Sequence, residues 1–189
     1  MSEQLTPTPG QTIGPFYGYA LPYDGGEALV DRSHPRAVRL HGTVYDGNGD
    51  PVPDSMLEIW QADEQGRVCQ EPGSLLRDGY TFTGFGRQAV DSVGAYSFTT
   101  VDPGPTRPGA APFIVMTIFA RGLLNRLFTR IYLPEDREAL ENDALLSSVP
   151  ADRRDTLIAQ REQDGSLRFD VRLQGEAETV FLRYPQHAN

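Results

Sequence analysis

The three histidines are the first residues of this sequence to test for metal chemistry, because imidazole is a common metal ligand. They are His34, His41 and His187. No two of them have the i, i+2 or i, i+4 spacing that places ligands on one face of a strand or helix, so we expect solvated or hydrogen-bonded side chains. The lone Cys69 has no histidine nearby in the sequence. We interpret it as a small buried or bystander residue rather than a nucleophile.

Three short motifs resemble known sites, but each lacks a part that the chemistry needs. Residues 84–89 read GFGRQA, a loose dinucleotide-binding fingerprint, yet they lie in a predicted strand with no helix after it. Residues 46–50 read DGNGD like the start of a calcium loop, but Pro51 and Leu57 stand where that loop needs Gly and Glu. The acidic run at 135–138 lies at a predicted helix start, where the helix dipole favours it. We therefore predict none of these sites.

The composition is that of a globular chain of one domain. The chain has 189 residues, 39% of them hydrophobic and 23% charged, and this length buries a sizeable core without disulfides. A formal net charge of −9 repels a phosphate backbone, which argues against nucleic acid as a partner. The N-terminal sequence lacks a leader-like pattern, and no run approaches the roughly 18 apolar residues of a membrane span. We therefore predict a cytoplasmic protein.

Alternating hydrophobic and polar residues predict strands through most of the chain. Residues 36–46 place Val38, Leu40 and Val44 on one face, which is typical of a half-buried strand. The segment MLEIWQAD follows as a return strand, so 36–62 is expected to form a hairpin-like unit. The other strand candidates are YTFTGFGRQAV (80–90), AYSFTTV (95–101), PFIVMTIF (112–119), RLFTRIYL (126–133) and FDVRLQG (169–175).

Helix is predicted in only two segments, 134–148 with Pro134 in its first turn, and 150–160. Short strands separated by turn signals predict an all-β, single-domain β-sandwich over residues 36–189, with one or two short helices. Residues 1–35 contain Pro and Gly too densely for either period. We predict that they form an extended N-terminal arm, which cannot build its own core and docks on a partner subunit.

Three segments of the chain, in order, resemble the intradiol ring-cleaving dioxygenases. They are GTVYDGNGDPVPDSMLEIWQADEQGR (42–67), DSVGAYSFTTVDPGP (91–105) and LFTRIYLPED (127–136). The N-terminal PTPGQTIGPFY and the C-terminal RFDVRLQGEAETVF are similar to the α subunits of two-subunit members rather than to their iron-carrying β subunits. The resemblance implies a β-sandwich fold. It also implies a role in cleaving 3,4-dihydroxybenzoate with O₂ to 3-carboxy-cis,cis-muconate, in the β-ketoadipate pathway.

The resemblance further implies a non-haem ferric ion held by two Tyr and two His, and this chain has neither residue type at the matching positions. Val68 follows QADEQGR and Thr106 follows PGP, where the catalytic subunit has Tyr. Phe113 and Val115 stand where it has His-x-His. We therefore expect Fe³⁺ on a β-subunit partner and none on this chain. The Pro/Gly-rich stretch 101–112 then leads into a former metal site that apolar side chains fill.

Substrate contacts are also implied, because the family's active site lies between the α and β subunits. The matching arm residues are Thr12, Gly14, Pro15 and Phe16, the last standing where the family often has Tyr. Arg130 is predicted to lie off the aliphatic face of its strand, and the resemblance places it near the substrate. A guanidinium grips a carboxylate with two hydrogen bonds, and 3,4-dihydroxybenzoate carries a carboxylate.

Two functions from different classes remain open. The leading interpretation is a non-catalytic α subunit that builds the interface with the β subunit and lines the substrate pocket. The alternative is a stand-alone transthyretin-like binding or scaffold module with no catalytic partner. A self-sufficient dioxygenase is disfavoured by the missing iron ligands.

Overall fold

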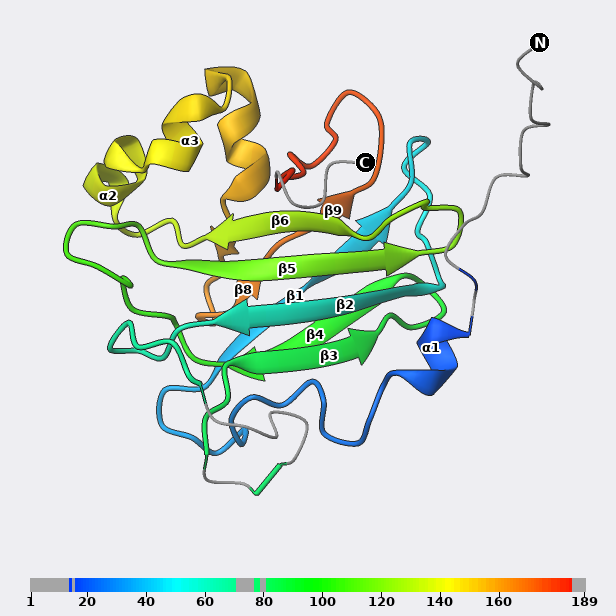
Figure 1. Cartoon of the computed structure of the whole chain (residues 1–189), viewed down its shortest axis with the longest axis horizontal. Coiled ribbons are helices and arrows are strands. Elements are labelled where there is room, and N and C mark those ends of the chain that lie inside the picture. Colours follow the sequence, from blue (N-terminus) through cyan, green and yellow to red (C-terminus); the bar gives the residue numbers. More distant parts are fainter. Residues whose placement is uncertain (1–13, 15, 71–76, 79–80, 185–189) are drawn as a thin grey trace, which may run out of the picture.

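The protein folds into two β-sheets packed face to face, as Figure 1 shows. The structure is a computed structural model that describes residues 14, 16–70, 77–78 and 81–184. Within that part, one sheet contains β4 (Ala95–Thr100), β1 (Val38–Tyr45), β8 (Leu167–Arg168), β7 (Gln160–Arg161) and β9 (Val171–Arg172). The other has the order β3 (Phe85–Ala89), β2 (Ser55–Gln61), β5 (Phe113–Ala120) and β6 (Leu127–Tyr132). The predicted all-β sandwich is confirmed.

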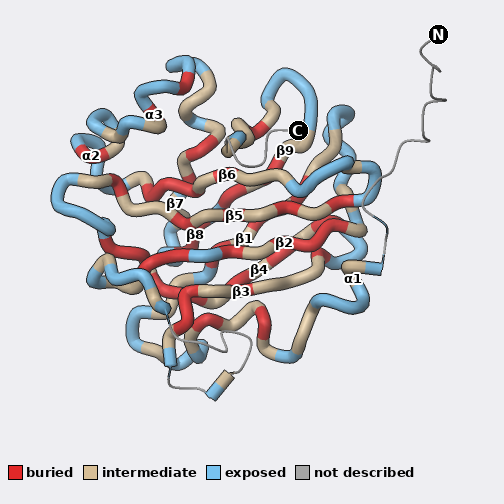
Figure 2. Tube along the Cα trace, viewed as in Figure 1, coloured by how far each residue is buried: buried red, intermediate tan, exposed pale blue. Residues whose placement is uncertain are grey.

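The core lies between the two sheets, because the strands bury alternate residues. In β5 every second residue from Ile114 to Ala120 is buried, and the residues between them are half-buried. In β1 the predicted inward face is confirmed, with Leu40 and Val44 fully buried. The buried rows of both sheets form one hydrophobic cluster, and its residues are among the buried segments drawn red in Figure 2.

The predicted hairpin of residues 36–62 is wrong, because its two strands belong to different sheets. β1 pairs with β4, β8 and β9, whereas β2 pairs with β3 and β5. The Asp46 carboxylate closes a tight turn by accepting from two amides, and a bridge between Tyr45 and Pro51 follows. Pro51 and Pro53 have no amide N–H with which to extend a ladder, so the chain crosses to the other sheet.

The predicted helix that begins at Pro134 is in fact two short helices, α2 (Arg137–Asn142) and α3 (Ala144–Ser148). Asp136 is the N-cap of α2, so Pro134 lies before the helix rather than in its first turn. Asp143 ends α2 and caps α3, and its extended backbone separates them. An Asp side chain that competes for backbone amides favours such a break.

Two other helical segments differ in kind from the prediction. Residues expected to form a short helix at 150–160 form a 3₁₀-helix, η1 (Ala151–Leu157). One turn of α-helix, α1 (Tyr17–Ala20), lies within the segment predicted to be extended. No helix in the described ranges is long and apolar enough to cross a bilayer.

Candidate functional site

A row of side chains crosses the outer face of the β3–β2–β5–β6 sheet. Trp60 of β2 is paired with Phe85 on one side and Val115 on the other, and Val115 is paired with Arg130 of β6. Trp60 is 50% exposed. At the Tyr132 end of this face, Ala139 of α2 and Leu146 of α3 pack in one buried cluster with Tyr132. Among the described residues, the part of the row around Trp60 is therefore open to a partner or ligand.

Arg130 is held against its own sheet by two contacts. Its Cζ atom lies 4.0 Å from the centroid of the Phe113 ring, which is close cation–π stacking. Its Nη1 donates to the Tyr132 hydroxyl over 3.2 Å. Its Nε is buried and has no hydrogen-bond partner among the residues that the structure describes. The Nε–H of Arg130 is thus a donor that the described part of the chain leaves without an acceptor.

Tyr132 links this arginine to the helical segment beyond the sheet. Its ring is fully buried and lies tilted against Phe113, with centroids 5.9 Å apart. Its hydroxyl donates to Oδ1 of Asp143 over 2.9 Å. Burial, opposed by Arg130 and reinforced by the Asp143 carboxylate, raises the pKa of Tyr132 to about 12. The phenol therefore keeps its proton well above neutral pH.

The four positions matched to iron ligands gather at one end of the sandwich. Phe113 and Val115 lie at the start of β5 with their side chains on the outer face of the sheet, where Phe113 packs beside Tyr132. Val68 lies in the loop that follows β2 and Thr106 in the loop that follows β4. The packing of these loops is tight, since the amide of Gly104 donates to the carbonyl of Asp63 over 2.8 Å.

The residues at these four positions do not fit Fe³⁺. A valine, a threonine, a phenylalanine and another valine offer no phenolate or imidazole. In the described ranges, no group of three or more His, Cys, Asp or Glu is arranged to hold a metal ion. Arg130, stacked on Phe113, puts a positive charge on the same face, and a positive charge repels a cation.

The predicted arm residues do not meet Arg130 within the described part of the chain. Phe16 is 79% exposed and precedes α1; Gly14 is also exposed, while Thr12 and Pro15 lie outside the described residues. The next residue, Tyr17, packs on Phe119, with ring centroids 6.2 Å apart. Phe119 is four positions along β5 from Val115, the partner of Arg130, or about 13 Å.

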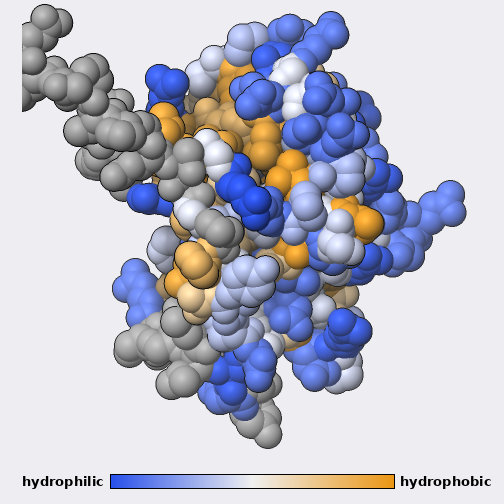
Figure 3. Space-filling view, turned by 90° about the vertical axis from the view of Figure 1, so that its right-hand side faces the viewer, coloured by the Kyte–Doolittle hydropathy of each residue, from blue (hydrophilic) through white to orange (hydrophobic). Residues whose placement is uncertain are grey.

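The end of the sandwich beside α1 is partly apolar. Figure 3 shows hydrophobic side chains in the middle of this face with hydrophilic ones around them. The large apolar residues exposed near α1 are Phe16, Tyr19 and Leu21. These exposed groups favour a contact surface rather than a free end.

Two histidines form hydrogen bonds, as predicted. Nε2 of His41 lies 2.8 Å from Oε2 of Glu162, and Nδ1 of His34 accepts from the Arg36 amide over 3.3 Å. His187 lies outside the described residues. Both described histidines are engaged in local contacts.

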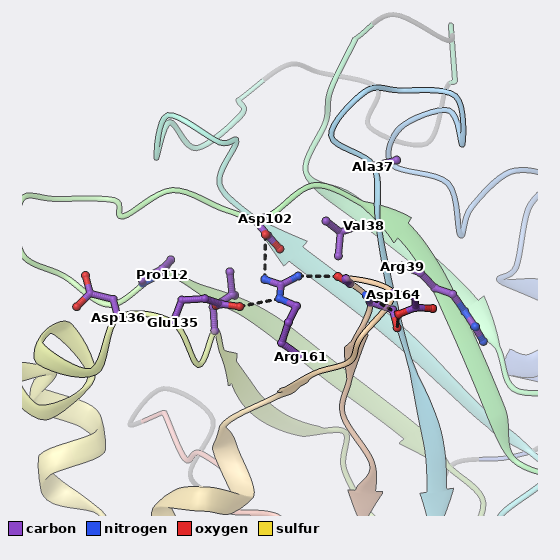
Figure 4. Close-up of a pocket in the computed structure, with 12 residues that line it drawn as sticks. Ala37, Val38, Arg39, Asp102, Pro112, Glu135, Asp136, Arg161 and Asp164 are labelled. Atoms are coloured by element: carbon purple, nitrogen blue, oxygen red, sulfur yellow. Dashed lines mark hydrogen bonds and ion pairs between the residues drawn. The ribbon is translucent and has the colours of Figure 1, made fainter.

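A pocket of about 670 Å³ lies at the edge of the other sheet (Figure 4). Its centre is Arg161, whose three nitrogens reach Glu135 at 2.6 Å, the Gly165 carbonyl at 2.9 Å and Asp102 at 2.9 Å. Every edge of this guanidinium is used by the chain itself. The acidic residue of the Pro/Gly-rich loop, Asp102, thus ties that loop to β7, and the arrangement is a structural tie rather than a binding site.

The hydrogen bonds that link Arg130 to Tyr132 and Tyr132 to Asp143 were not predicted from the sequence. Tyr132 is two residues from Arg130, so strand alternation places it on the same face, and this signal was available. Asp143 lies within the helix predicted over residues 134–148, where an acidic residue is expected to face solvent. Only the break between α2 and α3 turns its carboxylate toward the sheet.

Comparison with known proteins identifies relatives over nearly the whole chain. Residues 12–175 match the family described as "Dioxygenase". The chain is 39% identical to the protocatechuate 3,4-dioxygenase alpha chain of Burkholderia cepacia, over 94% of this chain and 98% of that protein. It is 30% identical to the beta chain from the same organism, over 97% of this chain and 83% of that protein.

A solved structure supports the same relationship. The dioxygenase domain of a dioxygenase and carbohydrate-binding fusion protein from Streptomyces sp. SirexAA-E has a TM-score of 0.59 with this chain at 25% identity. The match covers 79% of this chain and 87% of that domain. The two-sheet architecture is therefore shared with a protein of the same class.

Proposed function

This chain belongs to the dioxygenase family, and on that premise we propose that it serves as the non-catalytic alpha chain of a protocatechuate 3,4-dioxygenase. The observation that carries the proposal is the 39% identity to an alpha chain over almost the full length of both proteins, against 30% to the beta chain. The complete enzyme would open the ring of protocatechuate (3,4-dihydroxybenzoate) with O₂, giving 3-carboxy-cis,cis-muconate.

The partner would be an iron-carrying beta chain. Supporting this division of labour, Phe113 and Val115 occupy the outer face of the β3–β2–β5–β6 sheet, where the family places a His-x-His pair, and Arg130 lies beside them. The iron, with the chemistry of the diol and O₂, would be held by the partner. The outer face of this sheet, with Trp60 half-exposed near the end of β2, is where we propose that the partner packs, since exposed Trp is typical of interface hot spots.

Arg130 would bind the carboxylate of protocatechuate. Its Nη1 is engaged by Tyr132, and its Nε–Nη2 edge has the side-on geometry that a carboxylate accepts with two parallel bonds. On a chain with a net charge of −9, a fixed guanidinium also gives a substrate anion a local attraction.

The N-terminal arm, residues 1–35, would dock on the partner, while residues 36–189 form the sandwich domain. In this proposal Thr12, Gly14, Pro15 and Phe16 line the partner's pocket. The exposure of Phe16 supports this. Phe16 is 79% exposed, so its burial against another chain would remove apolar surface from water, which is favourable.

The test is to produce this chain alone and together with the iron-carrying chain made alongside it. Alone, the chain is expected to contain no stoichiometric iron, no tyrosinate-to-iron colour and no dioxygenase activity. Produced together, the two chains are expected to copurify with iron and to oxidise protocatechuate. A red, iron-loaded preparation of the isolated chain would contradict the proposal, and failure to copurify would favour a stand-alone binding module.

A further inference from the structure

We propose that Tyr132, oriented by Asp143, is a positioning residue that holds the Arg130 guanidinium with its Nε–Nη2 edge turned to the substrate carboxylate. This inference rests on the proposed function, in which Arg130 contacts that carboxylate. It adds two residues, neither of which touches the substrate, to the part of the chain that determines specificity for a carboxylated diol.

The N–H groups of the Arg130 guanidinium are not all engaged within the described part of the chain. A guanidinium has five N–H donors in a planar fork, and two of its edges match a carboxylate. The Tyr132 hydroxyl accepts from Nη1 over 3.2 Å, so one of the two Nη groups is already engaged. The side-on edge remains, and its Nε is buried without a partner in the described structure. A buried donor without a partner is costly, so a carboxylate that meets it relieves a penalty already present in the chain.

The Tyr132 hydroxyl donates its proton to Asp143 and accepts from Arg130. Oδ1 of Asp143 accepts from the Tyr132 hydroxyl at 2.9 Å and from the amides of Leu145 and Leu146 at 2.9 and 3.0 Å. A carboxylate only accepts, so the phenol proton points to Asp143 and an oxygen lone pair faces Arg130. The pKa of about 12 keeps that proton in place at working pH.

The contacts with Phe113 and Tyr132 also restrict the motion of the Arg130 side chain. Arg130 has a long side chain whose freedom would otherwise be lost on binding each substrate molecule. Phe113 supports one face of the guanidinium, and the Tyr132 hydroxyl fixes its rotation in that plane. Asp143 is in turn fixed because it caps α3. The N-cap of a helix thus orients a substrate-binding arginine through one tyrosine.

The main test is Tyr132→Phe in the complete enzyme with its iron-carrying partner. We expect the KM for protocatechuate to rise about 3- to 10-fold, because the guanidinium loses one orienting hydrogen bond but keeps its own contact with the carboxylate, and kcat should be nearly unchanged. With catechol, which has no carboxylate, kcat/KM should change less than twofold. Tyr96→Phe is the matched control, since Tyr96 is also buried and its hydroxyl donates to the Phe169 carbonyl away from this face. It should leave both substrates unaffected.

A second variant guards against misfolding. Asp143→Ser keeps an N-cap side chain for α3 but is too short to reach the Tyr132 hydroxyl, so it should reproduce the selective loss in part. A double-mutant cycle separates positioning from a general structural role. If Tyr132 acts through Arg130, Tyr132→Phe should have no further effect on KM in an Arg130→Ala background.

Each outcome of these measurements decides a different point. A large effect of Arg130→Ala with no effect of Tyr132→Phe or Asp143→Ser would overturn this inference and leave the proposed role of Arg130 intact. No effect of Arg130→Ala on protocatechuate would overturn that role itself. Equal losses on protocatechuate and catechol, or additive effects in the double mutant, would show that Tyr132 is merely structural.

Discussion

Arg130 is the residue on which substrate selectivity depends in this proposal. Arg130→Ala removes a charge-assisted contact worth on the order of 1.5–3 kcal/mol, so the apparent KM for protocatechuate is expected to rise roughly 10- to 200-fold. Arg130→Lys should recover only part of the loss, because an ammonium cannot reproduce the two-pronged geometry. Steady-state kinetics of the assembled enzyme measure both effects.

The control for Arg130→Ala is a second substrate, catechol, rather than a second variant. Catechol lacks the carboxylate, so its kcat/KM should change much less than that of protocatechuate. Iron content and assembly should be retained, because the proposed metal site is on the other chain. Similar damage with both substrates, or none with either, would mean that Arg130 has a structural role on its sheet.

At this scale the sequence predicted which residue types are present but not how they contact each other. The position of Arg130 off the aliphatic face follows from strand alternation, and in β6 the buried Thr129 and Ile131 flank the half-buried Arg130. Its stacking on Phe113 requires the register between β5 and β6, which no local pattern specifies. The link from Tyr132 to Asp143 spans a strand end and a helix break, and it depends on tertiary packing.

Among the elements, the N-terminal arm and its anchor can be separated by truncation. The Tyr17 hydroxyl donates to the Asp54 carbonyl and its ring packs on Phe119, so deletion of residues 1–16 leaves this anchor in place. We expect the shortened chain to melt at the temperature of the intact chain. Association with the beta chain should weaken by about tenfold or more, since the proposed docking residues are lost.

Calorimetry of the isolated chain and sedimentation of the mixed chains measure the two effects. The matched variant is Tyr17→Ala in the full-length chain, which removes the anchor and keeps the arm, and it should lower the melting temperature. Unchanged assembly and turnover after the deletion would show that the arm is a dispensable tail.

The longer strands could be predicted from the sequence, but their pairing and the break between α2 and α3 could not. Alternation identified β1, β4, β5 and β6, because half-buried strands need it. It did not identify partners, so the expected hairpin is instead a crossover between sheets. The helix predicted over residues 134–148 is interrupted at Asp143. No local sequence pattern distinguishes a carboxylate that caps a helix from one that is exposed to solvent.

For the whole molecule, the consequential feature is a row of side chains that faces outward from one sheet. The outer face of the β3–β2–β5–β6 sheet carries Trp60, Phe85 and Val115 in one row beside Arg130. When a partner covers a half-exposed tryptophan, apolar surface is removed from water, which favours association. The side chain has few rotatable bonds, so little conformational entropy is lost. The proposed substrate contact and the proposed partner surface are therefore the same face.

Trp60→Glu tests this coincidence. The side chain is 50% exposed, so the isolated chain should fold with an unchanged melting temperature, whereas a charge in the proposed interface should weaken association with the beta chain by at least about tenfold. Val93→Glu is the matched control, because Val93 is 60% exposed but lies in the turn before β4, away from the row. Analytical ultracentrifugation of each variant mixed with the beta chain gives the comparison. Equal association of the two variants would place the partner on another face, and the substrate carboxylate could then no longer reach Arg130 from the partner's pocket.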